Sequence, residues 1–396
     1  MHWAVLLSIP LTAAAVGLAT RALIVVLLFK PRKFLGVGPL GWYGAVPRSA
    51  GKLAAVNADL LTGRMLTTQQ LFADVDPQRL FAEVEQPLLR TIDTVAHETL
   101  AKHHPTVWEA LPLFVQDMVV KRLQAAAPWI VRELVDRLRG HADWVVDIRD
   151  IVLRRLSDPD RMSRLIRAMT IADLRRSSVV ALGAGLLAGV VEAAVLAVVP
   201  WKLLLPVFGA AVAVSACWVA AEWIFRPRRP HTVGRLLLRG PFHRRRAAIT
   251  KIYAGLVAEE VLTPAVLLDA LANGVERRQA RAVLEDIVDE LVDEQVRALR
   301  TLVSATIGTD QLPAMKRTAA ARALENLPYT ARPAHRYLGE AMAVQRRVSY
   351  GLAELTDAEF ELLARPALQS ARWALTVIVA VAGAAVGAIQ MMLPLT

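Results

Sequence analysis

The chain has 396 residues, of which 55% are hydrophobic, and its mean hydropathy is +0.39. These values exceed what a soluble enzyme of this length needs, so they indicate an integral membrane protein. The formal net charge of +11 fits nucleic acid or an anionic membrane surface, but aromatic residues are only 6% of the chain and are not interleaved with the basic runs, which disfavours base stacking. The single cysteine, Cys217, excludes an intramolecular disulfide and a cysteine-rich metal site.

Four apolar stretches are long enough to cross a bilayer as helices. They cover residues 4–29, 178–199, 203–225 and 372–394. The first runs into FKPRK without a small-residue cleavage site, which favours a retained span over a secretory signal. Basic residues follow the first and third spans and precede the second and fourth. The positive-inside rule therefore predicts a multi-pass cell-membrane protein with residues 30–177 and 226–371 in the cytoplasm and both termini outside it.

The sequence that follows the first span recurs without a gap 196 positions later, where FKPRKFLGVGPLGWYGAVPR overlies FRPRRPHTVGRLLLRGPFHR. The match resumes at the closing spans with a shift of 198, so we expect a tandem parallel repeat of span, cytoplasmic helices and span. We interpret the matched stretch as a membrane-exit elbow that occurs in each half. Its residues are Phe29, Pro31, Arg32, Gly38, Gly44, Pro47 and Arg48 in the first half, and Phe225, Pro227, Arg228, Gly234 and Gly240 in the second.

Within the first elbow, Gly36, Gly38 and Gly41 spell GxGxxG, the fingerprint of a dinucleotide site. That site needs a preceding strand and an acidic residue about twenty positions later, whereas here a predicted span precedes the glycines. The second half also lacks counterparts of Gly36 and Gly41. We therefore expect no cofactor, and we assign the retained glycines to a sharp turn at the level of the lipid headgroups, with the neighbouring aromatic residues in the interface.

Several short motifs occur in an order that resembles a known family. They are the FKPR and GAVPR stretches of the first elbow, HPTVWEALP at residues 104–112, and ADLRR at residues 172–176 before a glycine-rich span that ends in GxxxGxxE. Over most of its length the chain resembles the YheB- and YjiN-like bacterial membrane proteins, domain-of-unknown-function family 445. The resemblance implies a membrane protein with large helical cytoplasmic segments, and it supplies no catalytic residues. The second half departs from the pattern where it reads GPFHR.

Both cytoplasmic segments carry helix signals and no strand-like alternation of useful length, so we expect an all-α fold. The predicted N-terminal caps are Asp76, Asp158 and Thr263, each before a proline, together with capping boxes at Thr106 with Glu109 and at Thr356 with Glu359. Between Val283 and Val303, apolar residues recur at threes and fours, opposite a run of acidic side chains. This stripe needs a partner, and the repeats could pack their stripes together as one bundle or as an elongated stalk.

Polar residues inside the predicted spans are costly and are often functional. The intramembrane polar residues are Glu192, its repeat mate Gln390, Arg21 and Glu222. Two interpretations stand beside each other: a proton or ion pathway, and interhelical hydrogen bonding, which Gln390 can provide although it cannot carry a proton. The small-residue pairs Gly185 with Gly189 and Gly383 with Gly387 predict close helix packing, between the second and fourth spans.

A basic run follows the third span, with leucines and Phe242 between its members. The run comprises Arg235, Arg239, Arg244, Arg245 and Arg246. Such a segment beside a membrane attracts anionic lipid, by about 1 kcal/mol per basic residue, or it serves only to fix the topology. We expect no nucleic-acid partner, because these cations lie at the headgroup level and no recognition fold is present. The histidines around His103 lack metal-ligand spacing, so we expect no metal site.

Two functions are consistent with these patterns. The first is a non-enzymatic scaffold or envelope-organising protein whose amphipathic cytoplasmic helices contact a protein partner, a second copy of the chain or anionic lipid. The second is binding or transport of a lipid or small solute through an apolar groove among those helices. No nucleophile motif of a known hydrolase occurs in the sequence, so neither hypothesis includes catalysis. The two hypotheses differ in one observable, since a groove favours lipid handling and fully paired stripes favour a scaffold.

Overall fold

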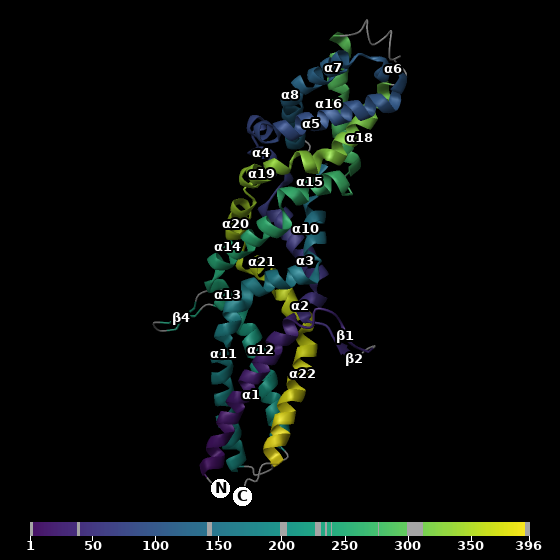
Figure 1. Ribbon diagram of the computed structural model, residues 1–396. Helices are drawn as coiled ribbons and strands as arrows, with labels where there is room; N and C mark the ends of the chain where they lie inside the picture. Colours follow the sequence, from purple (N-terminus) through teal and green to yellow (C-terminus); the bar gives the residue numbers. More distant parts are fainter. Residues whose placement is uncertain are drawn as a thin grey trace. The chain divides into compact units, whose positions relative to one another are not determined.

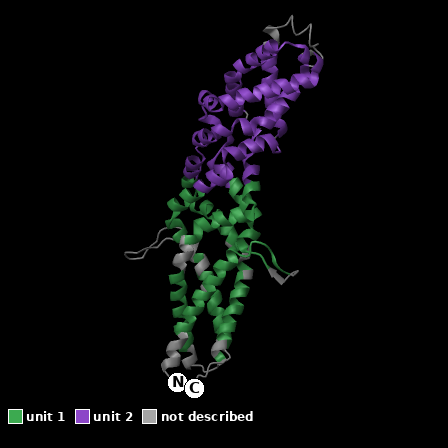
Figure 2. Ribbon diagram, viewed as in Figure 1, with its two compact units in different colours: residues 1–59, 153–253, 352–396 green, residues 60–152, 254–351 purple. Residues whose placement is uncertain are grey.

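The computed structural model describes residues 3–37, 40–140, 145–198, 204–225, 231–233, 236–238, 240–275, 277–298 and 312–392. Nearly all of the secondary structure in these ranges is helical, which confirms the predicted all-α class. The chain divides into two compact units, and each unit draws on both halves of the sequence (Figure 2). Unit 1 comprises residues 1–59, 153–253 and 352–396, and unit 2 comprises residues 60–152 and 254–351.

The longest helices of unit 1 are α1 (Trp3–Phe29), α11 (Pro159–Val198), α12 (Leu204–Phe225) and α22 (Arg365–Met392). They form a bundle in which α1 packs along α11 and α12 packs along α22 (Figure 1). Each of the four predicted spans lies largely in one of these helices. However, α11 and α22 both begin before the predicted span starts at residues 178 and 372, because no proline interrupts either helix after its first turn.

One stretch of the bundle, Pro10–Phe29 in α1, is long and apolar enough to cross a membrane. The described parts of the other three helices contain shorter apolar stretches, Ser178–Ala194, Pro206–Val219 and Leu375–Ala388. A single apolar helix near an N-terminus is weak evidence for a span, since a signal sequence has the same composition. The four-span topology therefore stays a prediction.

The rest of unit 1 consists of short helices and two hairpins. Its helices are α2 (Ala45–Arg48), α3 (Ala50–Leu60), α13 (Pro241–Arg244), α14 (Arg246–Leu256) and α21 (Asp357–Leu362), and α3 and α14 continue into unit 2. The aromatic side chains of Phe242, Tyr253 and Phe360 are fully buried at its centre. The Tyr253 hydroxyl donates a hydrogen bond of 2.9 Å to Asn57 Oδ1 on α3, which joins the two halves of the chain.

Two antiparallel hairpins, β1 (Leu35–Val37) with β2 (Leu40–Trp42) and β3 (His231–Val233) with β4 (Leu236–Leu238), occupy the elbow stretches. No strand was expected there, because three residues are too few for a detectable alternation. Gly36 and Gly41 of the GxGxxG pattern lie opposite each other in the ladder, and Gly36 has a φ of 144° that favours glycine. These two glycines, which the second half does not retain, therefore belong to a hairpin.

Unit 2 is built from helices alone in the part of it that the structure describes. From the first half come η1 (Leu61–Met65), α4 (Thr68–Ala73), α5 (Pro77–His103), α6 (Pro105–Ala110), α7 (Leu113–Ala125), α8 (Ala127–Gly140) and most of α10 (Ile148–Leu156). From the second half come η2 (Val257–Val261), α15 (Pro264–Asn273), α16 (Arg277–Ala298), α18 (Leu312–Thr330), η3 (Arg332–Ala334), α19 (His335–Met342) and most of α20 (Val344–Glu354). Helix α18 packs against both α5 and α16.

Most of the predicted helix caps are present. Asp76 accepts a backbone hydrogen bond at the start of α5, Thr263 does so at α15, and Asp158 precedes α11 and accepts from the amide of Asp160. Thr356 and Glu359 form the predicted capping box of α21. The capping box predicted at Thr106 is wrong, because α6 already begins at Pro105.

Element boundaries recur along the chain at a constant spacing. The elements β3, β4, α13, α14 and η2 each begin and end 196 positions after β1, β2, α2, α3 and η1. Asn57 and Tyr253, which are bonded to each other, are also 196 positions apart. Residues at equivalent positions of two related halves can meet only near an axis that relates those halves.

Candidate functional site

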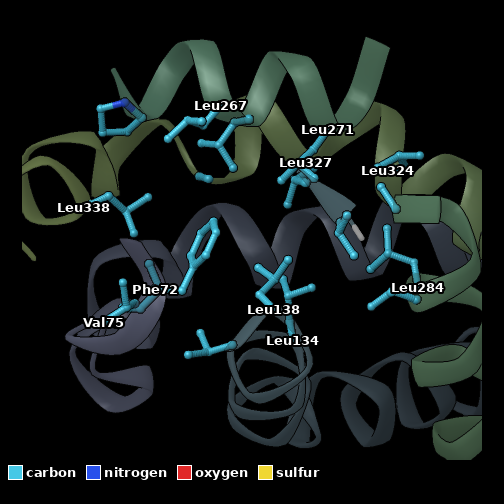
Figure 3. A pocket seen from close by; sticks show the side chains of 18 of the residues that line it. Phe72, Val75, Leu134, Leu138, Leu267, Leu271, Leu284, Leu324, Leu327 and Leu338 are labelled. Carbon is cyan, nitrogen blue, oxygen red and sulfur yellow. The ribbon is translucent and has the colours of Figure 1, made fainter. Parts of the chain in front are cut away.

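Unit 2 contains a partly open cavity whose walls come from α4, α5, α8, α15, α16, α18 and α19 (Figure 3). The volume of the cavity is about 90 Å³. All 19 lining residues are apolar. Among them, Leu134, Leu138, Leu271, Leu284, Leu324 and Leu327 are labelled in the close-up view.

Helical spacing explains why so many leucines converge on this space. Leu134 and Leu138 are four residues apart on α8, as are Leu267 and Leu271 on α15, so each pair projects from one face of its helix. The sequence signal for these faces is ordinary amphipathicity, which predicts burial but not an unfilled space. The cavity residues on α8, α15 and α18 are therefore site residues that sequence reasoning missed.

The chemistry of the cavity is restricted to apolar binding. A wall without donors or acceptors leaves a buried water short of partners, so a cavity of this kind stays dry or takes an apolar molecule. A polar or charged ligand group inside it would lose its hydration without compensation.

The predicted amphipathic helix at residues 283–303 corresponds to α16 over the residues that the structure describes. Its stripe is covered, with Leu284, Ile287 and Leu291 all buried. The sequence suggested that the apolar stripes of the two halves could pack against each other. Instead, α5 of the first half and α16 of the second half both pack against α18. A bundle with a cavity results, in place of two stripes that fill each other.

The acidic face of α16 meets basic side chains from two neighbouring helices. Arg137 of α8 forms ion pairs with Asp286 and Glu290, and Lys316 of α18 approaches Asp289 at 3.4 Å and Asp293 at 2.7 Å. Burial lowers the pKa of Lys316, but its hydrogen bond to Asp293 and the nearby carboxylates outweigh this and raise the pKa. The run of like charge is thus matched by cations that hold α16 against α8 and α18.

The predicted glycine contacts occur in the bundle of unit 1, but with other partners than expected. A Cβ on Gly185 would lie 2.7 Å from the Ala13 carbonyl of α1, and one on Gly383 would meet Gly209 of α12. Gly387 also approaches Gly209. The predicted contact between the second and fourth spans is therefore wrong for these glycines. A small-residue pair predicts close approach without specifying the partner helix.

The structure describes three of the four polar side chains of the predicted spans. Glu192 is 3% exposed, and its Oε1 has no hydrogen-bond partner in the described ranges. The side chain of Gln390 lies outside the described residues, so the predicted pairing is untested. Arg21 and Glu222 are half-buried and interact with other groups.

In the elbow of the first half, Gly44 packs closely against the backbone of residues 29–31. The amide of Gly44 donates to the Pro31 carbonyl at 3.0 Å, and a Cβ on Gly44 would lie 3.1–3.2 Å from backbone atoms of Phe29, Lys30 and Pro31. Arg32 pairs with Asp160 of α11 at 3.2 Å. Pro47 is buried and Arg48 is exposed. Gly240 is buried before α13, the side chain of Phe225 is outside the description, and so are the predicted elbow residues Gly38, Pro227, Arg228 and Gly234.

The members of the basic run at residues 235–246 lie in different environments. Arg246 donates to Asp357 at 3.0 Å and to the carbonyls of Leu352 and Leu355, so its guanidinium group has partners within unit 1, and lipid binding by this residue stays a prediction. Arg244 is exposed and Arg245 is half-buried with an interaction of its own. Arg235 and Arg239 lie outside the described residues.

A buried polar cluster beside Arg246 was not expected. His243 Nε2 lies 3.0 Å from Glu361 Oε1, and both side chains are essentially inaccessible to solvent. Glu361 also accepts a hydrogen bond of 2.7 Å from Arg365. The positions equivalent to His243 and Glu361 in the first half hold Pro47 and Ser163, so the repeat contained no signal for this pair. The cluster joins α13 to α21 and α22.

Within the described ranges, no group of three or more histidine, cysteine, aspartate or glutamate residues could hold a metal ion. No protein-family model matches the chain, and no curated protein matches its sequence. The resemblance to the YheB- and YjiN-like proteins therefore stays a prediction, and the function has to be argued from the site itself.

Proposed function

We propose that this chain is a multi-pass membrane protein that binds the acyl chain of a lipid in the cavity of unit 2. The observation that carries the proposal is a cavity in unit 2 whose 19 lining residues are all apolar. Lipid acyl chains are the apolar molecules that a membrane protein meets at high concentration. The proposal is one of binding and contains no catalytic step.

The bundle of unit 1 supports the membrane part of the proposal. Its outward side chains include large apolar groups on all four helices, such as Leu11 at 67% exposure, Leu187 at 72%, Val207 at 64% and Trp373 at 76%. Its closest helix contacts involve glycine and alanine. Apolar groups outside and small residues inside are typical of helices that pack within lipid, because the hydrophobic effect does not drive their association there.

The recurring boundaries support the further proposal that the two halves are a tandem parallel repeat. Five elements repeat at one spacing, and the bond between Asn57 and Tyr253 joins equivalent positions. Within unit 1, the start of α1 and the end of α22 lie at the same end of the bundle (Figure 1). This is the arrangement that the proposed topology requires, with both large polar segments in the cytoplasm.

The lipid proposal is tested by filling the cavity. Leu327→Trp adds an indole to a position whose side chain lines the space, whereas Leu113→Trp adds the same group at a position that is 82% exposed on α7. Native mass spectrometry of the full chain in detergent, titrated with mono-oleoylglycerol and oleate, should show saturable binding in the wild type and in Leu113→Trp. Leu327→Trp should lose it. Equal binding by all three proteins would reject the cavity as the site.

One observation favours a scaffold function as a second proposal. Leu113, Phe114 and Met118 form an apolar patch on α7, at 82%, 68% and 59% exposure. Exposed apolar groups that adjoin on one helix are typical of protein contact sites. A Phe114→Glu variant should then lose a cross-linked partner or a second copy of the chain in membranes, while lipid binding stays intact. Unchanged cross-linking would remove the support for this second function.

A further inference from the structure

We propose that the lipid bound in unit 2 is anionic, and that arginines around the turn between α4 and α5 hold its charged headgroup while one acyl chain fills the cavity. This inference rests on the proposed function and specifies its ligand class. The shared chemistry of that class is a terminal carboxylate or phosphate next to an apolar chain.

The turn between α4 and α5 forms one end of the cavity. Phe72 near the end of α4 and Val75 in the turn line the space together with Leu338 of α19, and the three side chains lie at the same end in the close-up view (Figure 3). Leu284 and Leu324 lie at the other end. The cavity therefore has two distinguishable ends, and the polar groups next to each end decide how an amphiphile would be oriented.

Two arginines are fixed to the backbone of the lining residues at the first end. Arg139 donates from Nε to the Phe72 carbonyl at 3.2 Å and from Nη2 to the Val75 carbonyl at 2.6 Å. Arg347 donates to the carbonyl of Met342, another lining residue, at 3.2 Å, and it bonds Asp74 at 2.6 Å. Two guanidinium groups thus contact the backbone of residues that line the cavity.

Two further arginines at this end are exposed. Arg346 has a side-chain exposure of 77% and approaches Asp74 only to 4.0 Å. The guanidinium carbon of Arg79 lies 5.2 Å from the ring centroid of Tyr337, and Arg79 has no carboxylate partner among the described residues. The Tyr337 hydroxyl accepts a hydrogen bond from the amide of Asp76 in the turn. These two cations are available to a ligand.

The carboxylates in the turn and the nearby Asp136 of α8 do not neutralise these four arginines. Asp74 is engaged by Arg347, Asp136 pairs with Arg139 at 3.2 Å, and Asp76 caps α5. Four arginines therefore meet three carboxylates, and the excess positive charge is on the exposed members. An anionic oxygen group can accept charge-assisted hydrogen bonds from such arginines, whereas a neutral headgroup gains much less.

Two arginines on the helices that form the opposite end are paired. Arg277 pairs with Glu325 at 3.2 Å, and Arg281 pairs with Glu285 at 2.8 Å, on the helices that carry Leu324 and Leu284. Paired charges offer an anion little net attraction. The charged headgroup is therefore expected at the turn between α4 and α5, with the chain directed toward Leu284 and Leu324.

The test removes the two exposed charges without disturbing the backbone contacts. The double variant Arg79→Gln/Arg346→Gln is compared with Arg90→Gln/Arg132→Gln, which removes the same charge from exposed positions elsewhere on unit 2. The ligands are oleate, 1-oleoyl lysophosphatidate and mono-oleoylglycerol, which share one chain and differ in headgroup. Binding is measured by native mass spectrometry of the full chain at two salt concentrations.

The wild type should bind oleate and the lysophosphatidate at least tenfold more tightly than mono-oleoylglycerol, and the preference should weaken in high salt. In Arg79→Gln/Arg346→Gln, the affinity for the anionic ligands should fall about tenfold and the affinity for the neutral ligand should not change. The control variant Arg90→Gln/Arg132→Gln should bind all three ligands as the wild type does. Comparison of the two anions shows whether a carboxylate or a phosphate fits better. Equal affinity for neutral and anionic ligands would overturn the inference and leave the cavity proposal intact, whereas no saturable binding of any ligand would overturn both.

Discussion

The hydrogen bond between Tyr253 and Asn57 provides a quantitative test of the packing between the two halves. Asn57 is 0% exposed, its Nδ2 donates to the Leu53 carbonyl, and its Oδ1 accepts from the Tyr253 hydroxyl at 2.9 Å. Tyr253→Phe removes the donor and leaves the amide oxygen buried without that bond. An unsatisfied buried acceptor costs about 1–3 kcal/mol, so the variant should unfold at an apparent Tm lower by roughly 2–10 °C.

An exposed tyrosine provides the control for this substitution. Tyr350→Phe makes the same chemical change at a side chain that is 72% exposed, and it should leave the apparent Tm within about 1 °C of wild type. The double variant Asn57→Leu/Tyr253→Phe should recover part of the loss, because both polar groups are then absent. If Tyr253→Phe and Tyr350→Phe have the same apparent Tm, the hydrogen bond between Tyr253 and Asn57 contributes nothing to stability, which contradicts the prediction.

The same pair predicts a dependence on alkaline pH. Burial raises the pKa of Tyr253, so the folded state holds the phenol proton more tightly than the unfolded state does. This contribution is fully present below the unfolded pKa of about 10 and is lost as the pH rises above that value. The wild type should therefore lose more stability between about pH 9 and 11 than Tyr253→Phe. Parallel profiles for the two proteins would contradict the buried, protonated phenol.

Further predictions concern packing, charge and chain length. Gly185→Ala should destabilise the bundle by several kcal/mol, since its Cβ would lie 2.7 Å from a backbone oxygen, whereas Gly183→Ala has open space and should be neutral in the same thermal assay. Arg137→Met should lower the urea midpoint by removing ion pairs to α16, and equal midpoints would show that these pairs contribute nothing. Burial and Arg332 lower the pKa of His335, so stability should fall as the pH drops below about 6.5, and His335→Gln should reduce that loss. Shortening a bound acyl chain by two methylenes should weaken binding roughly fifteenfold, from about 0.8 kcal/mol per buried methylene, and an affinity independent of chain length would argue against the cavity.

The local features of this fold could be predicted from the sequence because their causes are local. A threonine or aspartate before a proline starts α5, α11 and α15, and Thr356 with Glu359 starts α21. The glycine at position 44 also has a local cause, because a side chain there would meet backbone atoms of the elbow. The three-residue hairpins escaped detection because they are too short to show a period.

The cavity and the helix partners depend on long-range packing and could not be predicted in this way. Leu271 and Leu324 follow the same pattern as a leucine in a filled core, and only the distances between several helices decide whether space remains. Gly185 indicated a close contact, but the pattern on one helix carries no information about which neighbour approaches it. The pairing of His243 with Glu361 joins residues 118 positions apart and has no counterpart in the first half.

The most direct test of acyl-chain binding is photocross-linking with a fatty acid that carries a diazirine at its terminal carbon. After irradiation of the full chain in membranes, peptide mapping locates the end of the chain. The proposed orientation predicts labelled peptides from α16 and α18, around Leu284 and Leu324, with loss of that labelling in Leu327→Trp and not in Leu113→Trp. Labelling confined to α1, α11, α12 and α22, with the same intensity in both variants, would contradict a lipid site in unit 2.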